Sequence, residues 1–161
     1  MKNVAAFLFC ILSLSSFGQK LSVAIVASDY NKSYEFYTTI LGMEKSNSFG
    51  LDDAQGKRTG LTNSLPFDVT VMKMEATADD IEWKLLTFKK EGTHPKQQYI
   101  HDDTGVQYVT IFVEDTRPFQ KRIKKNNIKL LGDTPIKLDD GRTFLLIQDP
   151  DGLFIEIIGP E

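Results

Sequence analysis

Cysteine is almost absent from this sequence, and histidine and tryptophan are scarce: the chain holds one cysteine, two histidines and one tryptophan. A single cysteine excludes an intramolecular disulfide framework and any zinc or iron–sulfur site built from several cysteines. Long apolar runs are lacking as well. The run at residues 4–12 falls short of the roughly 20 residues that a membrane-spanning helix requires. A disulfide scaffold and a polytopic membrane protein are therefore both excluded.

The N-terminal residues have the layout of a secretory signal peptide. Lys2 supplies a short positive region, the apolar run at 4–12 follows, and small residues precede a cut before Gln19. Cys10 lies in the middle of the run, without the small residue that stands before a lipidated cysteine. We therefore expect a signal peptide at residues 1–18 and export to the periplasm or the medium, with no stable membrane span after cleavage. Cleavage would remove the cysteine and with it any thiol catalysis.

The remaining composition is that of an ordinary soluble globular domain. Apolar residues make up 41% of the chain and charged residues 25%, with a net charge of −3. An acidic chain lacks the basic footprint that nucleic-acid binding needs, so we expect no nucleic-acid partner. The basic residues around Ile123 indicate the solvated outer face of a helix.

The chain repeats one pattern twice. Residues 22–29 can be laid on residues 108–115, because each is a β-branched-rich run that ends in Asp and leads into a helical pattern. Strand-like runs follow each helix, at 44–51, 67–75 and 81–88 in the first half and at 128–131, 142–148 and 153–158 in the second. Each half therefore has the pattern β-α-β-β-β, and the polar stretch at 89–105 is the predicted linker.

Local signals mark the ends of these elements. Asp29 is the predicted N-cap of the first helix, and Gly42 follows its last apolar position. Asp115 or Thr116 caps the second helix, with Pro118 in its first turn. The sequence Asp-Pro-Asp-Gly at 149–152 predicts a hairpin turn. The charged residues at 52–58 suggest a mobile loop.

Two sets of residues carry a resemblance to a known family. The first set is the run at 22–29 with the pairs Phe36-Tyr37 and Leu41-Gly42, and the second is the turn at 149–152 with the apolar strand that follows it and its single Glu156. The sequence resembles the vicinal oxygen chelate superfamily, which unites glyoxalases, bleomycin-resistance proteins and extradiol dioxygenases. The resemblance implies an α+β fold in which two βαβββ modules form a curved, half-open mixed sheet around a cavity, with helices outside. The domain would span 20–161, with module one at 20–88, the linker at 89–105 and module two at 106–160.

The resemblance also implies where a metal would bind. In metal-dependent members the ligands come from the starts of the first and fifth strands and the middles of the fourth and eighth. These positions are Ser22, Tyr108, Lys84 and Glu156 in this sequence. Of the four, Glu156 alone is a good ligand, and the ammonium of Lys84 would repel a divalent cation. We therefore expect neither a metal ion nor another cofactor.

Strand alternation predicts which side chains face the cavity. If Glu156 faces it, Ile155 and Ile157 face a helix, and Trp83 is equally helix-facing. The hypothesis is that Lys84 takes the place of the metal, pairs with Glu156 and orients a ligand. The predicted cavity residues are Ser22, Lys84, Tyr108, Phe112 and Glu156. It stays open whether Lys84 instead extends into solvent while Glu156 is merely a hydrogen-bonded carboxylate.

The expected function is the binding of a small polar or anionic molecule without a metal. The alternative is a divalent-metal-dependent lyase or isomerase of the glyoxalase type, or a dioxygenase. A third possibility is an interaction module whose groove holds a partner chain. His94 and His101 lie in the linker and are expected to be solvated, and no catalytic residue can be assigned. Because the family often pairs modules between chains, a homodimer is an open alternative to a monomer.

Overall fold

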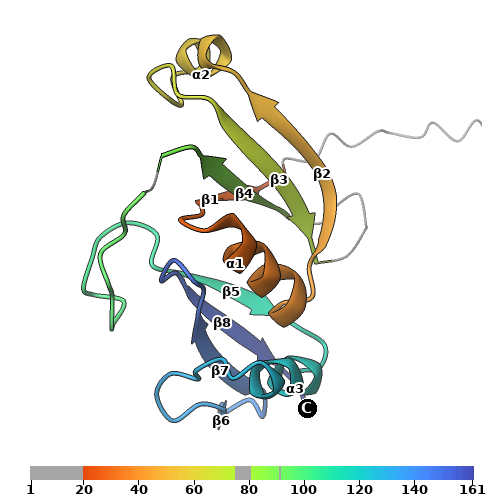
Figure 1. Cartoon of the computed structure of the whole chain (residues 1–161). Helices are drawn as coiled ribbons and strands as arrows, with labels where there is room; N and C mark the ends of the chain where they lie inside the picture. Colours follow the sequence, from red (N-terminus) through yellow and green to blue (C-terminus); the bar gives the residue numbers. More distant parts are fainter. Residues whose placement is uncertain (1–19, 75–80, 91) are drawn as a thin grey trace, which may run out of the picture.

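The computed structural model describes residues 20–74, 81–90 and 92–161, which form two four-stranded mixed sheets and a few helices (Figure 1). This is the predicted α+β fold, and neither sheet closes into a barrel. The predicted signal peptide lies outside the described residues. Within those residues, no helix has the length and apolar character needed to cross a membrane.

The first sheet has the strand order β1-β4-β3-β2. Its edge strand β1 (Ser22–Val26) runs parallel to β4 (Glu82–Phe88), whereas β3 (Phe67–Lys73) is antiparallel to both β4 and β2 (Glu44–Leu51). A short helix, α2 (Asp53–Thr59), connects β2 to β3.

The second sheet repeats this topology in the order β5-β8-β7-β6. Strand β5 (Tyr108–Phe112) runs parallel to β8 (Phe154–Gly159), and β7 (Thr143–Gln148) is antiparallel to β8 and to the two-residue β6 (Ile136–Lys137). The register matches the sequence repeat, because Ala24 lies opposite Lys84 in the first sheet and Thr110 lies opposite Glu156 in the second.

The helices of the two repeats begin where the local signals predict. Helix α1 (Tyr30–Glu35) is capped by the carboxylate of Asp29 and continues as a π-helical turn, η1 (Phe36–Ile40). Gly42 follows with a φ of 80°, a conformation that glycine adopts without strain. Helix α3 (Arg117–Lys125) has Thr116 as its N-cap residue, with Pro118 in its first turn. The turn at 149–152 joins β7 to β8 as predicted.

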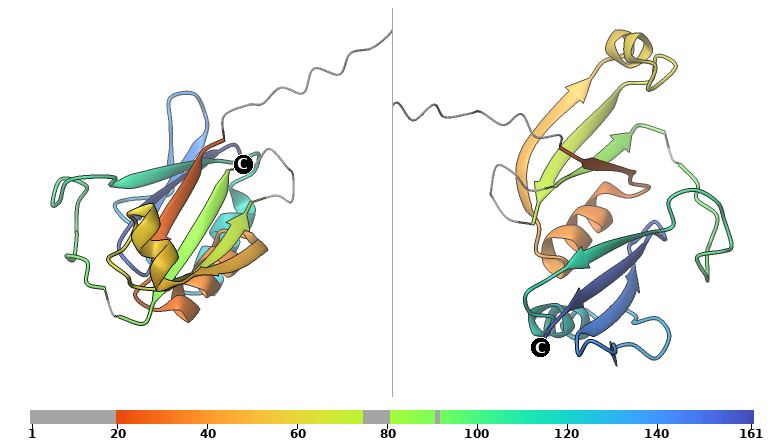
Figure 2. Two further views of the ribbon diagram at one scale, coloured as in Figure 1. Left: turned by 90° about the horizontal axis from the view of Figure 1, so that it is seen from above. Right: turned by 180° about the vertical axis from the view of Figure 1, so that it is seen from behind.

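One apolar core serves both modules. Helix α1 lies between the two sheets, and α3 covers the second sheet, as Figure 1 and the right view of Figure 2 show. The predicted helix-facing side chains Trp83, Ile155 and Ile157 are buried in this core. Arg122 of α3 donates from its Nε to the carbonyl oxygen of Ile40 at 2.7 Å, which joins the second module to the end of η1. Within the described part of the chain, each sheet therefore has one face that no helix covers.

Three local expectations are wrong. Residues 128–131 do not form a strand. Ile128 and Leu130 pack against the core from an irregular segment, and the fourth strand of the second sheet is β6. Residues 52–58 are not a loop, because a capping box between Asp52 and Gln55 starts α2. Strand β4 begins at Glu82, one residue later than expected, and β3 ends at Lys73, with residues 75–80 outside the described part.

Candidate functional site

The helix-free face of the first sheet is centred on Lys84. In the strand register Lys84 lies between Ala24 of β1 and Val71 of β3. An apolar cluster of Phe67, Val69 and Val71, with Leu86 and Phe88 packed against it, covers the rest of this face. Val26 at the end of β1 is 50% exposed. The face is therefore largely apolar around Lys84, with the carboxylate of Glu82 lying 3.7 Å from the Nζ of Lys84.

The helix-free face of the second sheet is centred on Glu156, which lies between Thr110 of β5 and Leu146 of β7. Tyr108 and Phe112 flank Thr110 on β5, and Phe112 is 68% exposed. All five predicted cavity residues thus lie on β1, β4, β5 or β8, with Lys84 and Glu156 at the equivalent positions that the repeat predicts. Whether they bind a ligand stays a prediction.

The structure gives Lys84 and Glu156 different partners. The Nζ of Lys84 lies 3.7 Å from a carboxylate oxygen of Glu82, and Glu156 accepts a hydrogen bond of 2.6 Å from the hydroxyl of Thr110. Within one chain, over the residues that the structure describes, Lys84 and Glu156 form no ion pair with each other. The predicted pairing is therefore not made inside a single chain, because the two residues belong to separate sheets whose helix-free faces turn away from the shared core.

The side chains at the family's ligand positions do not fit a metal ion. An ammonium group stands at the middle of β4, and the carboxylate beside it, that of Glu82, faces this ammonium. Among residues 20–74, 81–90 and 92–161, no group of three His, Cys, Asp or Glu side chains is placed to hold a metal. A protein metal site normally needs at least three such ligands.

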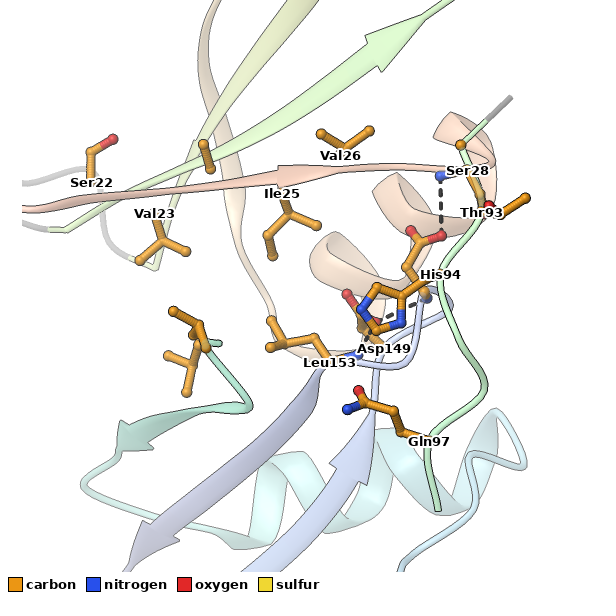
Figure 3. Close-up of a pocket in the computed structure, with 15 residues that line it drawn as sticks. Ser22, Val23, Ile25, Val26, Ser28, Thr93, His94, Gln97, Asp149 and Leu153 are labelled. Atoms are coloured by element: carbon orange, nitrogen blue, oxygen red, sulfur yellow. Dashed lines mark hydrogen bonds between the residues drawn. The ribbon is translucent and has the colours of Figure 1, made fainter. Parts of the chain in front are cut away.

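A separate pocket lies at the seam between the modules. Its volume is about 560 Å³, and it runs along β1, past the start of β5 and the β7–β8 turn, to the linker (Figure 3). Of the predicted cavity residues, Ser22 lines it. The other lining residues are Val23, Ala24, Ile25, Val26, Ser28, Gly92, Thr93, His94, Gln97, Val106, Val109, Asp149, Asp151 and Leu153.

Two carboxylates of the turn stand at one end of this seam pocket. Asp149 is buried and accepts hydrogen bonds from the backbone N–H groups of Asp151 and Leu153 at 2.9 Å, and from the hydroxyl of Tyr37 at 2.5 Å. Burial raises the pKa of Asp149 above its ordinary value, and the bond from Tyr37 partly offsets this rise. Burial and the nearby Asp149 charge raise the pKa of Tyr37. Tyr37 is therefore a neutral donor to Asp149.

Linker residues that the sequence placed in a solvated loop help to form this pocket. The side chains of His94 and Gln97 reach from the linker toward Asp149 and Leu153 (Figure 3). Gln148 holds the linker in place, because its amide donates to the carbonyl oxygen of Gln97 at 3.2 Å. Both histidines are exposed, but His101 is not among the residues that line the pocket and stacks on Tyr99. No spacing in the sequence distinguishes the two histidines, since the contact that separates them is tertiary.

Comparisons with known proteins agree with this architecture. The model of the family described as Glyoxalase/Bleomycin resistance protein/Dioxygenase superfamily matches residues 21–157. A search of curated proteins finds no significant match. Among solved structures, a glyoxalase family protein from Bacillus cereus is 18% identical with a TM-score of 0.71, over 92% of this chain and 97% of that one.

Two further structures resemble the chain. A glyoxalase family protein from Enterococcus faecalis is 21% identical with a TM-score of 0.60, over 88% of this chain and 98% of its own. The trypanothione-dependent glyoxalase I of Leishmania major is 18% identical with a TM-score of 0.59, over 88% of this chain and 86% of its own. At these identities the likeness shows the fold alone.

Proposed function

Because this chain belongs to the glyoxalase/bleomycin resistance protein/dioxygenase superfamily, we propose that it is an exported protein that binds a small polar or anionic molecule without a metal ion. The proposed site is made by the helix-free sheet faces and includes Ser22, Lys84, Tyr108, Phe112 and Glu156. The observation that carries the proposal is Lys84, whose ammonium stands at the middle of β4 between Ala24 and Val71.

The chemistry of the two faces supports a ligand with an apolar part and a negative or hydrogen-bonding part. Lys84 offers donors beside an apolar surface, where an anionic ligand would compete with the carboxylate of Glu82 for its ammonium. Glu156, held by Thr110, and the hydroxyl of Tyr108 can accept hydrogen bonds from neutral polar groups. Phe112 adds an exposed aromatic ring for stacking.

We further propose that two copies of the chain complete the site. Each chain exposes apolar side chains on its helix-free faces, among them Val26, Phe49, Tyr108 and Phe112. Exposed apolar surface of this kind favours association, and a symmetric dimer buries it on both copies. Face-to-face pairing of the first sheet of one copy with the second sheet of the other would bring Lys84 opposite the Glu156 of the partner subunit. Light scattering after size-exclusion chromatography tests for the dimer, and a monomer would contradict this part of the proposal.

Titration calorimetry with benzoate tests the anion site. Benzoate combines a carboxylate with an apolar ring, and we expect it to bind the parent protein. Lys84→Met should weaken this binding by about tenfold or more, the usual effect of losing a hydrogen bond to a charged group. Lys121→Met is the matched control, because Lys121 is exposed on α3 and should leave binding unchanged. Equal binding by the parent and Lys84→Met would refute the role of Lys84, and no binding by the parent would refute the anion site.

The alternative is a divalent-metal-dependent lyase or isomerase of the glyoxalase type, or a dioxygenase. It is favoured by the family and by structural neighbours such as the glyoxalase I of Leishmania major. Metal analysis of the purified protein separates the two functions. Stoichiometric zinc, iron, nickel or manganese that survives dialysis would reverse our order of preference, whereas a metal-free protein that binds benzoate through Lys84 would support the first function.

A further inference from the structure

The seam pocket shares Ser22, Ala24 and Val26 with the edge of the first helix-free face, but its other walls give it a chemistry of its own. Its walls are aliphatic, formed by Val23 and Ile25 of β1, Val109 of β5 and Leu153, the residue before β8. In Figure 3, Val23, Ile25 and Leu153 surround one part of the space, and His94, Gln97 and Asp149 lie toward the other. The pocket is therefore amphipathic along its length, and its volume of about 560 Å³ falls in the range of small-molecule sites.

Its polar end is rich in hydrogen-bond acceptors. The carboxylate of Asp151 accepts one bond from the backbone N–H of Ser28 and one from the hydroxyl of Ser33, both at 3.1 Å. A carboxylate has about four lone-pair sites, so acceptor capacity remains on Asp151. The amide of Gln97 donates to Gln107 through its nitrogen, which leaves the amide oxygen available.

His94 adds a further acceptor. Its Nδ1 lies 2.9 Å from the carbonyl oxygen of Pro95. Because a carbonyl oxygen can only accept, Nδ1 carries the proton in the neutral ring, and Nε2 is left as an acceptor. The ring also stands over the turn, since a methyl group at Gly152 would come within 3.9 Å of Nδ1.

The charge in the pocket has one sign. Asp149 and Asp151 bring two carboxyl groups, and none of the described residues that line the pocket is lysine or arginine. An anion placed there would meet carboxylates and acceptor atoms with no cation to offset them, and burying a charge without a partner is strongly unfavourable. The occupant must therefore supply donors, and a positive charge would be attracted.

We propose that the seam pocket binds a small organic amine in its protonated form. An ammonium group has three N–H donors and no acceptor, which matches the free acceptors of Asp151, Gln97 and His94. Its apolar body would lie against Val23, Ile25 and Leu153. The ligand class is a primary amine on an aliphatic or aromatic body of about ten heavy atoms or more, which a pocket of this volume can accommodate. This site does not depend on the function proposed above.

Titration calorimetry with phenethylamine and two analogues of similar shape tests the charge requirement. Phenethylamine should bind, and 2-phenylethanol should bind more weakly by about tenfold or more, because it lacks the charged donor. The anion 3-phenylpropanoate should not bind. Equal affinity for the amine and the alcohol would overturn the proposal. Absence of amine binding would overturn it as well, while leaving the benzoate result untouched, so the two proposals fail separately.

Two variants locate the binding. Asp151→Asn removes one charge and should weaken phenethylamine binding by about tenfold, whereas Asp133→Asn, on an exposed residue outside the pocket, should not. Asp151 also accepts hydrogen bonds from Ser28 and Ser33, so its replacement could lower stability as well as binding. A second variant therefore tests the location without removing these bonds. Val106 is 80% exposed at the pocket rim, so Val106→Trp should fill the pocket and abolish binding without loss of stability. Leu61→Trp, at a residue 68% exposed elsewhere, is its control. Unchanged amine binding in Val106→Trp would refute this location.

Discussion

Replacing Tyr37 with phenylalanine should destabilise the protein by about 2 kcal/mol, because it removes the buried hydrogen bond that ties η1 to the β7–β8 turn. Tyr37 is 0% exposed and Asp149 is 5% exposed, and the hydroxyl donates to the carboxylate at 2.5 Å. Hydrogen bonds to charged groups contribute about 1.5–3 kcal/mol. The carboxylate keeps its bonds from Asp151 and Leu153, which favours the lower half of that range. For a domain of this size the melting temperature should fall by about 4–8 °C.

The loss should also depend on pH. Burial raises the pKa of Asp149 and the bond from Tyr37 lowers it, so the variant should have a still higher pKa at this carboxyl. Above the pKa of the folded variant, Asp149 is ionised in both proteins and the full loss is present. As the pH falls through that pKa toward the parent value, the variant takes up its proton first and the difference in stability shrinks.

Denaturant unfolding followed by the fluorescence of Trp83 measures this effect. Trp83 is the single tryptophan, is buried, and its ring lies 5.3 Å from that of Tyr37. The control is Tyr34→Phe on the same helix, where Tyr34 is only partly buried, so the change should be within about 0.5 kcal/mol. If Tyr37→Phe cost no more than Tyr34→Phe, or cost the same at every pH, the hydrogen bond would not couple the modules as argued.

Two further predictions concern packing between elements. Gly159→Ala should destabilise the protein by several kcal/mol, because the new methyl group would overlap the backbone carbonyl of Val113. Gly92→Ala is the control and should be tolerated, because there is open space around Gly92. Thermal unfolding of the two variants compares their stabilities. Arg122→Met should lower the free energy of unfolding by about 1–2 kcal/mol, because the hydrogen bond to the carbonyl of Ile40 is lost while an aliphatic side chain still packs there. Denaturant titration measures this loss, and an unchanged midpoint of unfolding would contradict the prediction.

The faces of the strands could be predicted from the sequence because side chains alternate with a period of two. Ile155 and Ile157 are buried in the core, while Glu156 between them lies on the opposite face. The helix ends were equally accessible, since Asp29 and Gly42 act through bonds and backbone angles within a few residues. Signals of this kind are local, and local physics is sufficient for them.

Other features were missed for identifiable reasons. The capping box that starts α2 is present in the sequence as Asp52 and Gln55, but the prediction of a loop rested on the charged residues around it. Residues 128–131 have strand-like composition, yet they form no strand, although the N–H of Leu131 donates to the carbonyl oxygen of Leu146 in β7. An apolar alternation predicts burial, and whether a partner strand is available decides between strand and irregular chain.

The relative placement of the two modules is the step that periodicity cannot supply, and it governs both proposed sites. The repeat makes Lys84 and Glu156 equivalent, and the register confirms this, with Ala24 and Thr110 as their neighbours. Equivalence does not bring them together, because the helices pack both sheets around one core and turn the helix-free faces away from it. The same packing places β1 beside the start of β5 and leaves the seam pocket between them. A duplicated module with a shared core therefore offers two candidate sites for a ligand: the face for which we propose completion by a second copy, and the seam that one chain forms alone.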